Sequence, residues 1–164
     1  MPTSLAPIVD DSTRVLVLGS MPGQVSLQMR QYYAHPRNAF WRIMSELLAF
    51  DGDIDYAARL DALRAAGIGL WDVLRVCDRR GSLDSAIVRE SMEPNDFEKL
   101  FVQHPRIAKV FFNGSKAQQV FSRSVAPGLH SEVEFERLPS TSPANAGVPC
   151  DAKLRAWRAV VDVS

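Results

Sequence analysis

The sequence has few cysteines and none in a ligand-like arrangement. Its 164 residues contain two, Cys77 and Cys150, with no Cys-x-x-Cys motif and no histidine nearby at ligand spacing. Two isolated thiols cannot supply the four ligands of an iron–sulfur cluster, and their spacing argues against a zinc site. We therefore expect no metal and no other cofactor.

The sequence also lacks a membrane or export signal and a net charge. No apolar run approaches the roughly 20 residues that cross a bilayer. The amino terminus lacks a basic region followed by an apolar stretch. These absences favour a cytosolic protein with no membrane partner, and the length suits one domain over residues 1–164. The formal net charge of zero does not exclude nucleic acid, because a neutral protein can carry a local basic face.

Three common site motifs are missing as well. Gly19-Ser-Met-Pro-Gly23 has neither the Gly-x-Gly-x-x-Gly spacing nor a Gly-Lys-Ser/Thr ending, which argues against dinucleotide and P-loop sites. There is no Gly-x-Ser-x-Gly elbow, and no serine, histidine and acid are spaced like a hydrolase triad. A small α/β hydrolase acting through Ser20 or Ser142 is therefore the least favoured interpretation.

Short apolar runs alternate along the chain with amphipathic stripes of helical period. Strands are predicted at 14–18, 68–74, 109–112 and 132–138. Helices are predicted at 40–48, at 55–66, at 95–102, after 113–114 through residue 121, and at 151–161. This order predicts an α/β protein whose parallel sheet carries helices on both faces. The polar loops that follow the strands are expected to converge at one edge of the sheet.

The stretch Tyr32–Trp41 is dense in two kinds of chemistry. It holds two tyrosines, a phenylalanine and a tryptophan together with His35, Arg37 and Asn38. Aromatic rings stack on flat ligands, while the other three supply polar contacts. The alternative is a core-packing helix start capped by Asn38. Its position after the tight turn Gly19–Gly23 favours a site.

Asp72 is a carboxylate within an apolar strand. An unpartnered buried carboxylate costs on the order of several kcal/mol. One interpretation is an ion pair with Arg75 or Arg79, and the other is a functional group.

Two further loops carry hydroxyls suited to phosphate. Leu138–Asn145 places three hydroxyls between two prolines, which can aim them at an anion, although such a loop alone is usually only a turn. Ser82 lies next to two arginines and repeats this chemistry.

Together these segments resemble the uracil-DNA glycosylase superfamily. The resemblance is carried by Gly19–Gly23, Tyr33–Trp41 and Leu138–Asn145, and it spans nearly the whole chain in order. The Ala-His-Pro-x-Asn-x-Phe-Trp string is shared with the mismatch-specific uracil/thymine branch. The hypoxanthine-DNA (deoxyinosine) glycosylase branch is closest, because it also has Tyr-Tyr-Ala-His-Pro-Arg-Asn, Leu-Trp-Asp-Val, Gly-Ser-Leu-Asp-Ser and Pro-Ser-Thr-Ser-Pro-Ala.

The resemblance implies a three-layer α/β/α sandwich with a central, mainly parallel four-stranded sheet. It implies a DNA repair enzyme that flips out a deaminated base (hypoxanthine, with uracil or xanthine as further candidates) and hydrolyses its glycosidic bond. The expected enzyme is monofunctional, although Lys116 is not excluded as an amine nucleophile. The expected partner is DNA containing deaminated bases, bound by a monomer in a bacterial-type cytosol, at the nucleoid when acting.

The resemblance also implies a set of site residues. Tyr33 takes the place of the ring that stacks on the base, and Asp72 that of an asparagine that reads the base edge. The predicted catalytic residues are Asn38, Ser20 and Met21. The predicted substrate-binding residues are Tyr33, Asp72, Gly19, Gly23 and His35, the last with a structural role as its alternative. The predicted DNA-binding residues are Ser82, Ser140, Thr141, Ser142, Ala144 and Asn145.

Three positions depart from the superfamily pattern. Met21 stands where many branches place the Asn or Asp that positions water, Ser140 replaces a His or Asn, and Ala144 sits where the mismatch branch has a bulkier wedge. The resemblance puts the catalytic weight on Asn38, whose amide can stabilise the departing base or position water. Two alternatives stay open: a mismatch-specific uracil-DNA glycosylase, and a catalytically weakened nucleic-acid-binding member.

Overall fold

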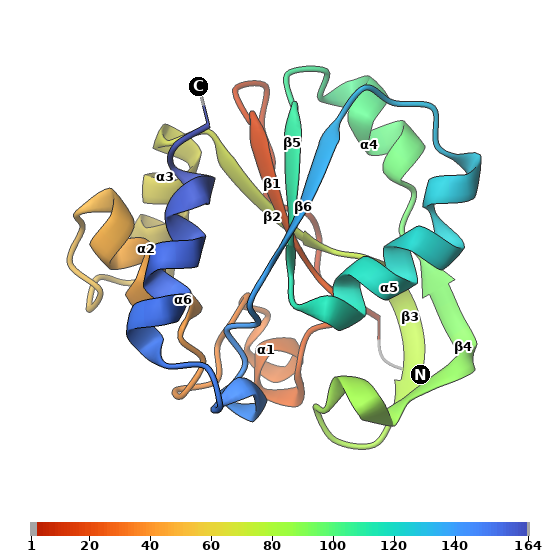
Figure 1. Cartoon of the computed structure of the whole chain (residues 1–164), viewed down its shortest axis with the longest axis horizontal. Coiled ribbons are helices and arrows are strands. Elements are labelled where there is room, and N and C mark those ends of the chain that lie inside the picture. Colours follow the sequence, from red (N-terminus) through yellow and green to blue (C-terminus); the bar gives the residue numbers. More distant parts are fainter. Residues whose placement is uncertain (1–2, 164) are drawn as a thin grey trace.

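Four parallel strands form the central sheet of the computed structural model, which describes residues 3–163 (Figure 1). Residues 1, 2 and 164 of the predicted domain lie outside the described residues. The strand order is β2-β1-β5-β6, and all three pairings are parallel. The strands are β1 (Val15–Gly19), β2 (Ile68–Asp72), β5 (Lys109–Asn113) and β6 (Glu134–Leu138). The predicted fold class is confirmed.

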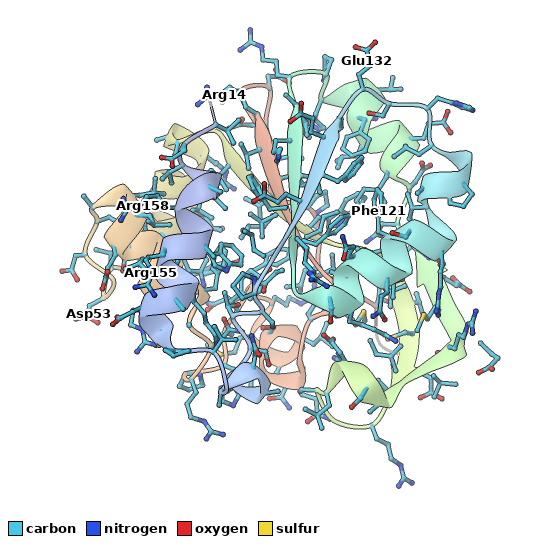
Figure 2. All side chains as sticks on the ribbon, in the orientation of Figure 1. Arg14, Asp53, Phe121, Glu132, Arg155 and Arg158 are labelled. Carbon is cyan, nitrogen blue, oxygen red and sulfur yellow. The ribbon has the colours of Figure 1, made fainter. Side chains whose placement is uncertain are left out.

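Alternating side chains of the sheet build two separate cores. Val15 and Val17 face one side of β1, while Leu16 and Leu18 face the other, as the pleat requires. One side is covered by α2 (Phe40–Leu48), α3 (Tyr56–Ala65) and α6 (Cys150–Trp157), and the other by α4 (Phe97–Gln103) and α5 (Ser115–Ser124) (Figure 1). On the second side Phe121 of α5 reaches toward the sheet (Figure 2), with its ring centroid 5.2 Å from that of Phe112.

The structure adds an antiparallel hairpin that the sequence pattern does not predict. It consists of β3 (Leu74–Arg79) and β4 (Ile87–Pro94). The predicted strand 68–74 was therefore too long, because the sheet strand ends at Asp72 and Leu74 already belongs to the hairpin. Two register shifts interrupt the pairing, so neither strand shows the alternation by which hairpins are found in a sequence.

A predicted loop and a predicted helix also need correction. The loop after Gly23 contains a six-residue helix, α1 (Gln24–Met29), too short and too polar to show a stripe. The helix predicted at 95–102 begins at Phe97, because Asp96 caps it by accepting from the Lys99 N–H at 3.1 Å. Asn95 instead donates its amide to the Asp72 carbonyl oxygen at 2.8 Å.

Single 3₁₀ turns complete the chain and shape its loops. They are η1 (Asp84–Ala86), η2 (Ala126–Gly128), η3 (Pro143–Asn145) and η4 (Arg158–Val160). The last one continues α6, so the predicted final helix 151–161 is α-helical only to Trp157. Within residues 3–163, no helix is both long and apolar enough to cross a membrane.

Candidate active site

A cleft of about 1370 Å³ opens where the strands of the sheet end. Gly19, Asp72, Asn113 and Leu138, the last residues of the four strands, all line it. Every residue predicted for the site lines the same cleft: Gly19, Ser20, Met21, Gly23, Tyr33, His35, Asn38, Asp72, Ser82, Ser140, Thr141, Ser142, Ala144 and Asn145. The expected convergence of loops at one edge is therefore present.

The side chains of Asp72 and Tyr33 both approach Gly19 closely. Gly19 pairs with Asp72 across the β1–β2 ladder. A Cβ at this position would lie 2.5 Å from the Asp72 Oδ1 and 3.5 Å from the Tyr33 hydroxyl. The absence of a side chain is what lets both groups approach the same stretch of backbone.

Replacing Gly19 with alanine is therefore expected to displace the Asp72 carboxyl. Because a 2.5 Å contact is impossible for a real Cβ, we expect a loss of activity of at least about 100-fold, as for other misplaced site groups. Thermal unfolding and the catalytic rate would be measured together. Gly147→Ala is the matched control, because an added Cβ there meets nothing within 4 Å.

The Asp72 carboxyl is buried and forms no ion pair with any residue of 3–163. Its side chain is 4% exposed, and its Oδ2 has no hydrogen-bond partner among the described residues. Of the two interpretations of Asp72, the ion pair with arginine is wrong: Arg75 pairs with Glu93, and Arg79 donates to the carbonyl oxygen of Pro22. Burial comes first, and the negative charge of Asp84 second, in raising the pKa of Asp72 to about 7, against a smaller opposing effect of Arg79.

Asp84 is a site residue that the sequence did not single out. Its Oδ1 accepts from the buried Ser20 hydroxyl at 2.5 Å, which ties the η1 turn to the loop after β1. The Ser20 hydroxyl is thus engaged by a carboxylate without a histidine between them, which is not the arrangement of a serine nucleophile. The signal for Asp84 lay in Gly-Ser-Leu-Asp-Ser, but its contact depends on the fold.

Tyr33 is held in an uncommon backbone conformation. Its φ is +55°, a left-handed value that costs a non-glycine residue about 1–2 kcal/mol. Its ring stacks on Phe40 with centroids 4.1 Å apart and planes at 25°. The hydroxyl is buried without a partner among residues 3–163, and burial raises the pKa of Tyr33. Strain of this kind is often retained where a side chain must be aimed into a site.

Asn38 serves the start of α2 and faces the cleft. Its Oδ1 accepts from the N–H of Phe40, the first residue of that helix, at 2.9 Å. This is the helix-start contact that the alternative interpretation of Asn38 predicts. Because the oxygen is occupied, the amide nitrogen is the group that remains for a ligand. His35 is partly structural too, since its Nδ1 accepts from the Arg37 N–H at 3.1 Å.

The buried residue Thr141 anchors the loop after β6. This residue is 1% exposed and exchanges two 2.9 Å hydrogen bonds with Asn113. Its carbonyl oxygen accepts from the Ala39 N–H at 3.0 Å, and the Trp157 ring N–H reaches Pro139 at 2.9 Å. The Thr141 hydroxyl therefore holds the loop in place, while the other hydroxyls stay nearer the surface.

Hydrogen bonds within the same loop fix its polar tip. The Ser140 Oγ accepts from the Ser142 N–H at 3.1 Å, and the Asn145 amide donates to the Ser140 carbonyl oxygen at 3.1 Å. Ser142 caps η3 by accepting from the Ala144 N–H at 3.2 Å. Both serine hydroxyls keep their proton available to an anion.

Comparisons with known proteins identify the family. A family model described as the uracil DNA glycosylase superfamily matches residues 6–161. The chain belongs to this superfamily. The predicted family is confirmed.

Relatives within the superfamily are similar over most of their length. A protein named hypoxanthine DNA glycosylase from Methanosarcina barkeri is 39% identical over 140 residues, 85% of each chain. One with the same name from Methanosarcina acetivorans is 37% identical over 84% of each. The solution NMR structure of a candidate uracil DNA glycosylase from Methanosarcina acetivorans is similar with a TM-score of 0.81 and 34% identity, covering 98% of this chain and 96% of that one.

Basic side chains line the rim of the cleft, as expected for a superfamily that acts on DNA. Arg37, Lys116 and Arg137 line it, and none of the three forms a salt bridge with another described residue. A neutral chain thus presents unpaired cations where a DNA backbone would pass. Sequence reasoning did not assign these residues to DNA, because ordinary surface arginines and lysines give the same signal. In residues 3–163 no group of three or more His, Cys, Asp or Glu side chains gathers as metal ligands would.

Met21, which departs from the superfamily pattern, packs in the hydrophobic core. Met21 is 6% exposed and belongs to the core cluster that includes Leu18 and Trp71. Its thioether is only a weak acceptor, so this position cannot hold a water as an Asn or Asp would. The polar groups that remain for chemistry are Asn38 and Asp72, which both line the cleft.

Proposed function

We propose that this superfamily member is a monofunctional DNA glycosylase that flips hypoxanthine, the base of deoxyinosine, into the cleft and hydrolyses its glycosidic bond. The observation that carries the proposal is the buried carboxyl of Asp72 at the end of β2. Its Oδ2 has no hydrogen-bond partner among the described residues, and both this carboxyl and the Tyr33 hydroxyl lie close to Gly19. Two relatives named hypoxanthine DNA glycosylase support the choice of base. The product is an abasic site in otherwise intact DNA.

Base recognition follows from the protonation of Asp72. With a pKa of about 7, its acid form is well populated at neutral pH, and that form offers one donor and one acceptor. Hypoxanthine presents a carbonyl next to a ring N–H, which such a carboxyl matches with two hydrogen bonds. Xanthine and uracil carry the same pair of groups. Tyr33 supplies a flat ring against which an extruded base stacks.

Bond cleavage needs stabilisation of the departing base more than a strong nucleophile. The base leaves with negative charge, so the productive partners are donors. The Asn38 amide nitrogen is one, because its oxygen is already bound to the Phe40 N–H. The acid form of Asp72 is another, whereas its ionised form would repel the base. This division leaves the methionine at position 21 without a catalytic duty.

DNA binding is assigned to the rim of the cleft. Arg37, Lys116 and Arg137 meet phosphates as cations, and Ser140 and Ser142 meet them as hydroxyl donors. Each neutralised phosphate steepens the salt dependence of binding, so three cations contribute a slope of about −3 in log K against log salt. We further propose that the protein acts as a monomer in the cytosol.

The proposal is tested with four labelled oligonucleotides carrying deoxyinosine, uracil, xanthine or no lesion, incubated in EDTA and then treated with alkali. We expect cleavage of the deoxyinosine strand. Cleavage of uracil alone would transfer the protein to the mismatch-specific uracil interpretation. Cleavage of none, with a retained mobility shift on DNA, would favour a binding protein instead.

The same reactions test whether the enzyme is monofunctional. Borohydride traps the imine that an amine nucleophile forms with the sugar, and Lys116 places one amine in the cleft. We expect no trapped adduct and no strand break before alkali. An adduct that disappears in Lys116→Gln would contradict hydrolysis by water.

A further inference from the structure

A flipped base leaves a gap in the duplex. Ala144, which stands where the mismatch branch has a wedge residue, is too small to fill that gap. Ala144 is exposed on the loop after β6, but its side chain is a single methyl group. Proteins that extrude or unstack bases commonly insert a larger apolar side chain between base steps. If the proposed base flipping holds, another residue at the mouth of the cleft must serve.

Leu83 has the required chemistry and place. Large apolar side chains that are exposed in the described part of the chain are Met29, Leu83, Val88, Val102 and Phe135. Of these five, Leu83 is the one that lines the cleft, and it is 56% exposed. An apolar side chain held in water at the rim of a polar cleft gains free energy if it enters a base stack.

The turn that carries Leu83 is anchored on both sides. Ser82, the residue before it, accepts from the Gln24 N–H at the start of α1 at 2.9 Å. Asp84, the residue after it, holds the Ser20 hydroxyl. The Leu83 carbonyl oxygen accepts from the Ala86 N–H at 3.1 Å. A side chain presented from such a turn loses little backbone freedom on insertion.

The turn also stands at the same end of the molecule as the loop it would complement. Figure 1 shows η1 and η3 at the end where the sheet strands terminate, with α1 in this region as well. Both the Ser82–Ser85 segment and the Ser140–Asn145 segment line the cleft. Arg80, just before the turn, is exposed and adds a cation for the neighbouring phosphates.

We propose that Leu83 is the wedge that enters the base stack of duplex DNA when the target base moves into the cleft. The contact is with the bases beside the vacated position, while the serine loop holds the phosphates. This inference rests on the proposed base flipping and adds to it the residue that keeps the duplex open. It predicts a role in double-stranded substrates that single strands do not need.

The test compares duplex with single-stranded deoxyinosine DNA under single-turnover conditions. Leu83→Ala is expected to slow excision from the duplex about 10- to 100-fold, because unstacking is no longer compensated, and to change single-strand excision less than about twofold. Leu83→Met should restore most of the duplex rate. Val88→Ala is the matched control: Val88 is 43% exposed on the hairpin and does not line the cleft.

A second readout separates this inference from the proposed function. A 2-aminopurine placed beside the lesion fluoresces when it is unstacked, whether or not a bond is cut. We expect wild-type binding to raise this signal and Leu83→Ala to abolish the rise. An unchanged duplex rate, an equal loss on both substrates, or an undiminished 2-aminopurine signal would each overturn the wedge. If no base is excised by the wild type, the proposed function fails and the fluorescence still decides the role of Leu83.

Discussion

Replacing Asn38 with alanine is expected to slow hypoxanthine excision about 100- to 1000-fold, the usual effect of removing one donor to developing negative charge. The Asn38 Oδ1 is bound to the Phe40 N–H at 2.9 Å, which leaves the amide nitrogen as the group available to donate to the base. Single-turnover rates with enzyme in excess would measure the chemical step. Fluorescence anisotropy with lesion DNA should show binding within about threefold of wild type, because no phosphate contact is lost.

Asn38→Asp separates the donor role of this residue from its role at the helix start. Aspartate still accepts from the Phe40 N–H, so the stability of about 1 kcal/mol that such a contact contributes is retained. It has no N–H to donate, so excision should be as slow as in Asn38→Ala. An Asn38→Asp enzyme with near wild-type turnover would show that Asn38 acts only through the helix.

The sheet and the position of the cleft were predictable because both rest on local pattern. β1 and β5 contain continuous apolar runs, residues 15–18 and 110–112, as expected for strands buried on both faces. Once strands alternate with helices, their carboxyl ends must share one edge. Gly19, Asp72 and Leu138 could therefore be placed together without knowledge of any contact.

The contacts inside the cleft were not predictable, because they join residues far apart in the chain. Ser20 and Asp84 are separated by 64 positions, and Asn113 and Thr141 by 28. The partner of a side chain at such distances depends on which way loops turn after the fold has formed. Arg79 illustrates this: proximity in sequence suggested Asp72, but its guanidinium is taken up by carbonyl oxygens of the loop after β1.

Raising the pH from 6 to 8 is expected to lower kcat/KM for deoxyinosine DNA about tenfold, since this parameter reports the titration of the free enzyme. The reason is that the Asp72 pKa of about 7 lies in this window and only the acid form both donates to the base and avoids repelling it. Asp72→Asn retains a donor and an acceptor without titrating, so its profile should be flat. Asp72→Leu has neither group and should lose about 100-fold or more in rate.

The same carboxyl couples stability to pH with a defined sign. Its pKa is raised in the folded protein from 3.8 to about 7, so between these values the folded state binds more protons than the unfolded state. Stability should therefore fall as pH rises from about 4 to about 7 and level off above, and Asp72→Asn should remove that part of the fall. Asp84→Asn removes the negative charge that is the second cause of the shift, so its activity should decline at a lower pH than in the wild type. A wild-type rate that instead rises through pH 7 would make the ionised carboxylate the working form, and the assignment of Asp72 as a donor to the departing base would be wrong.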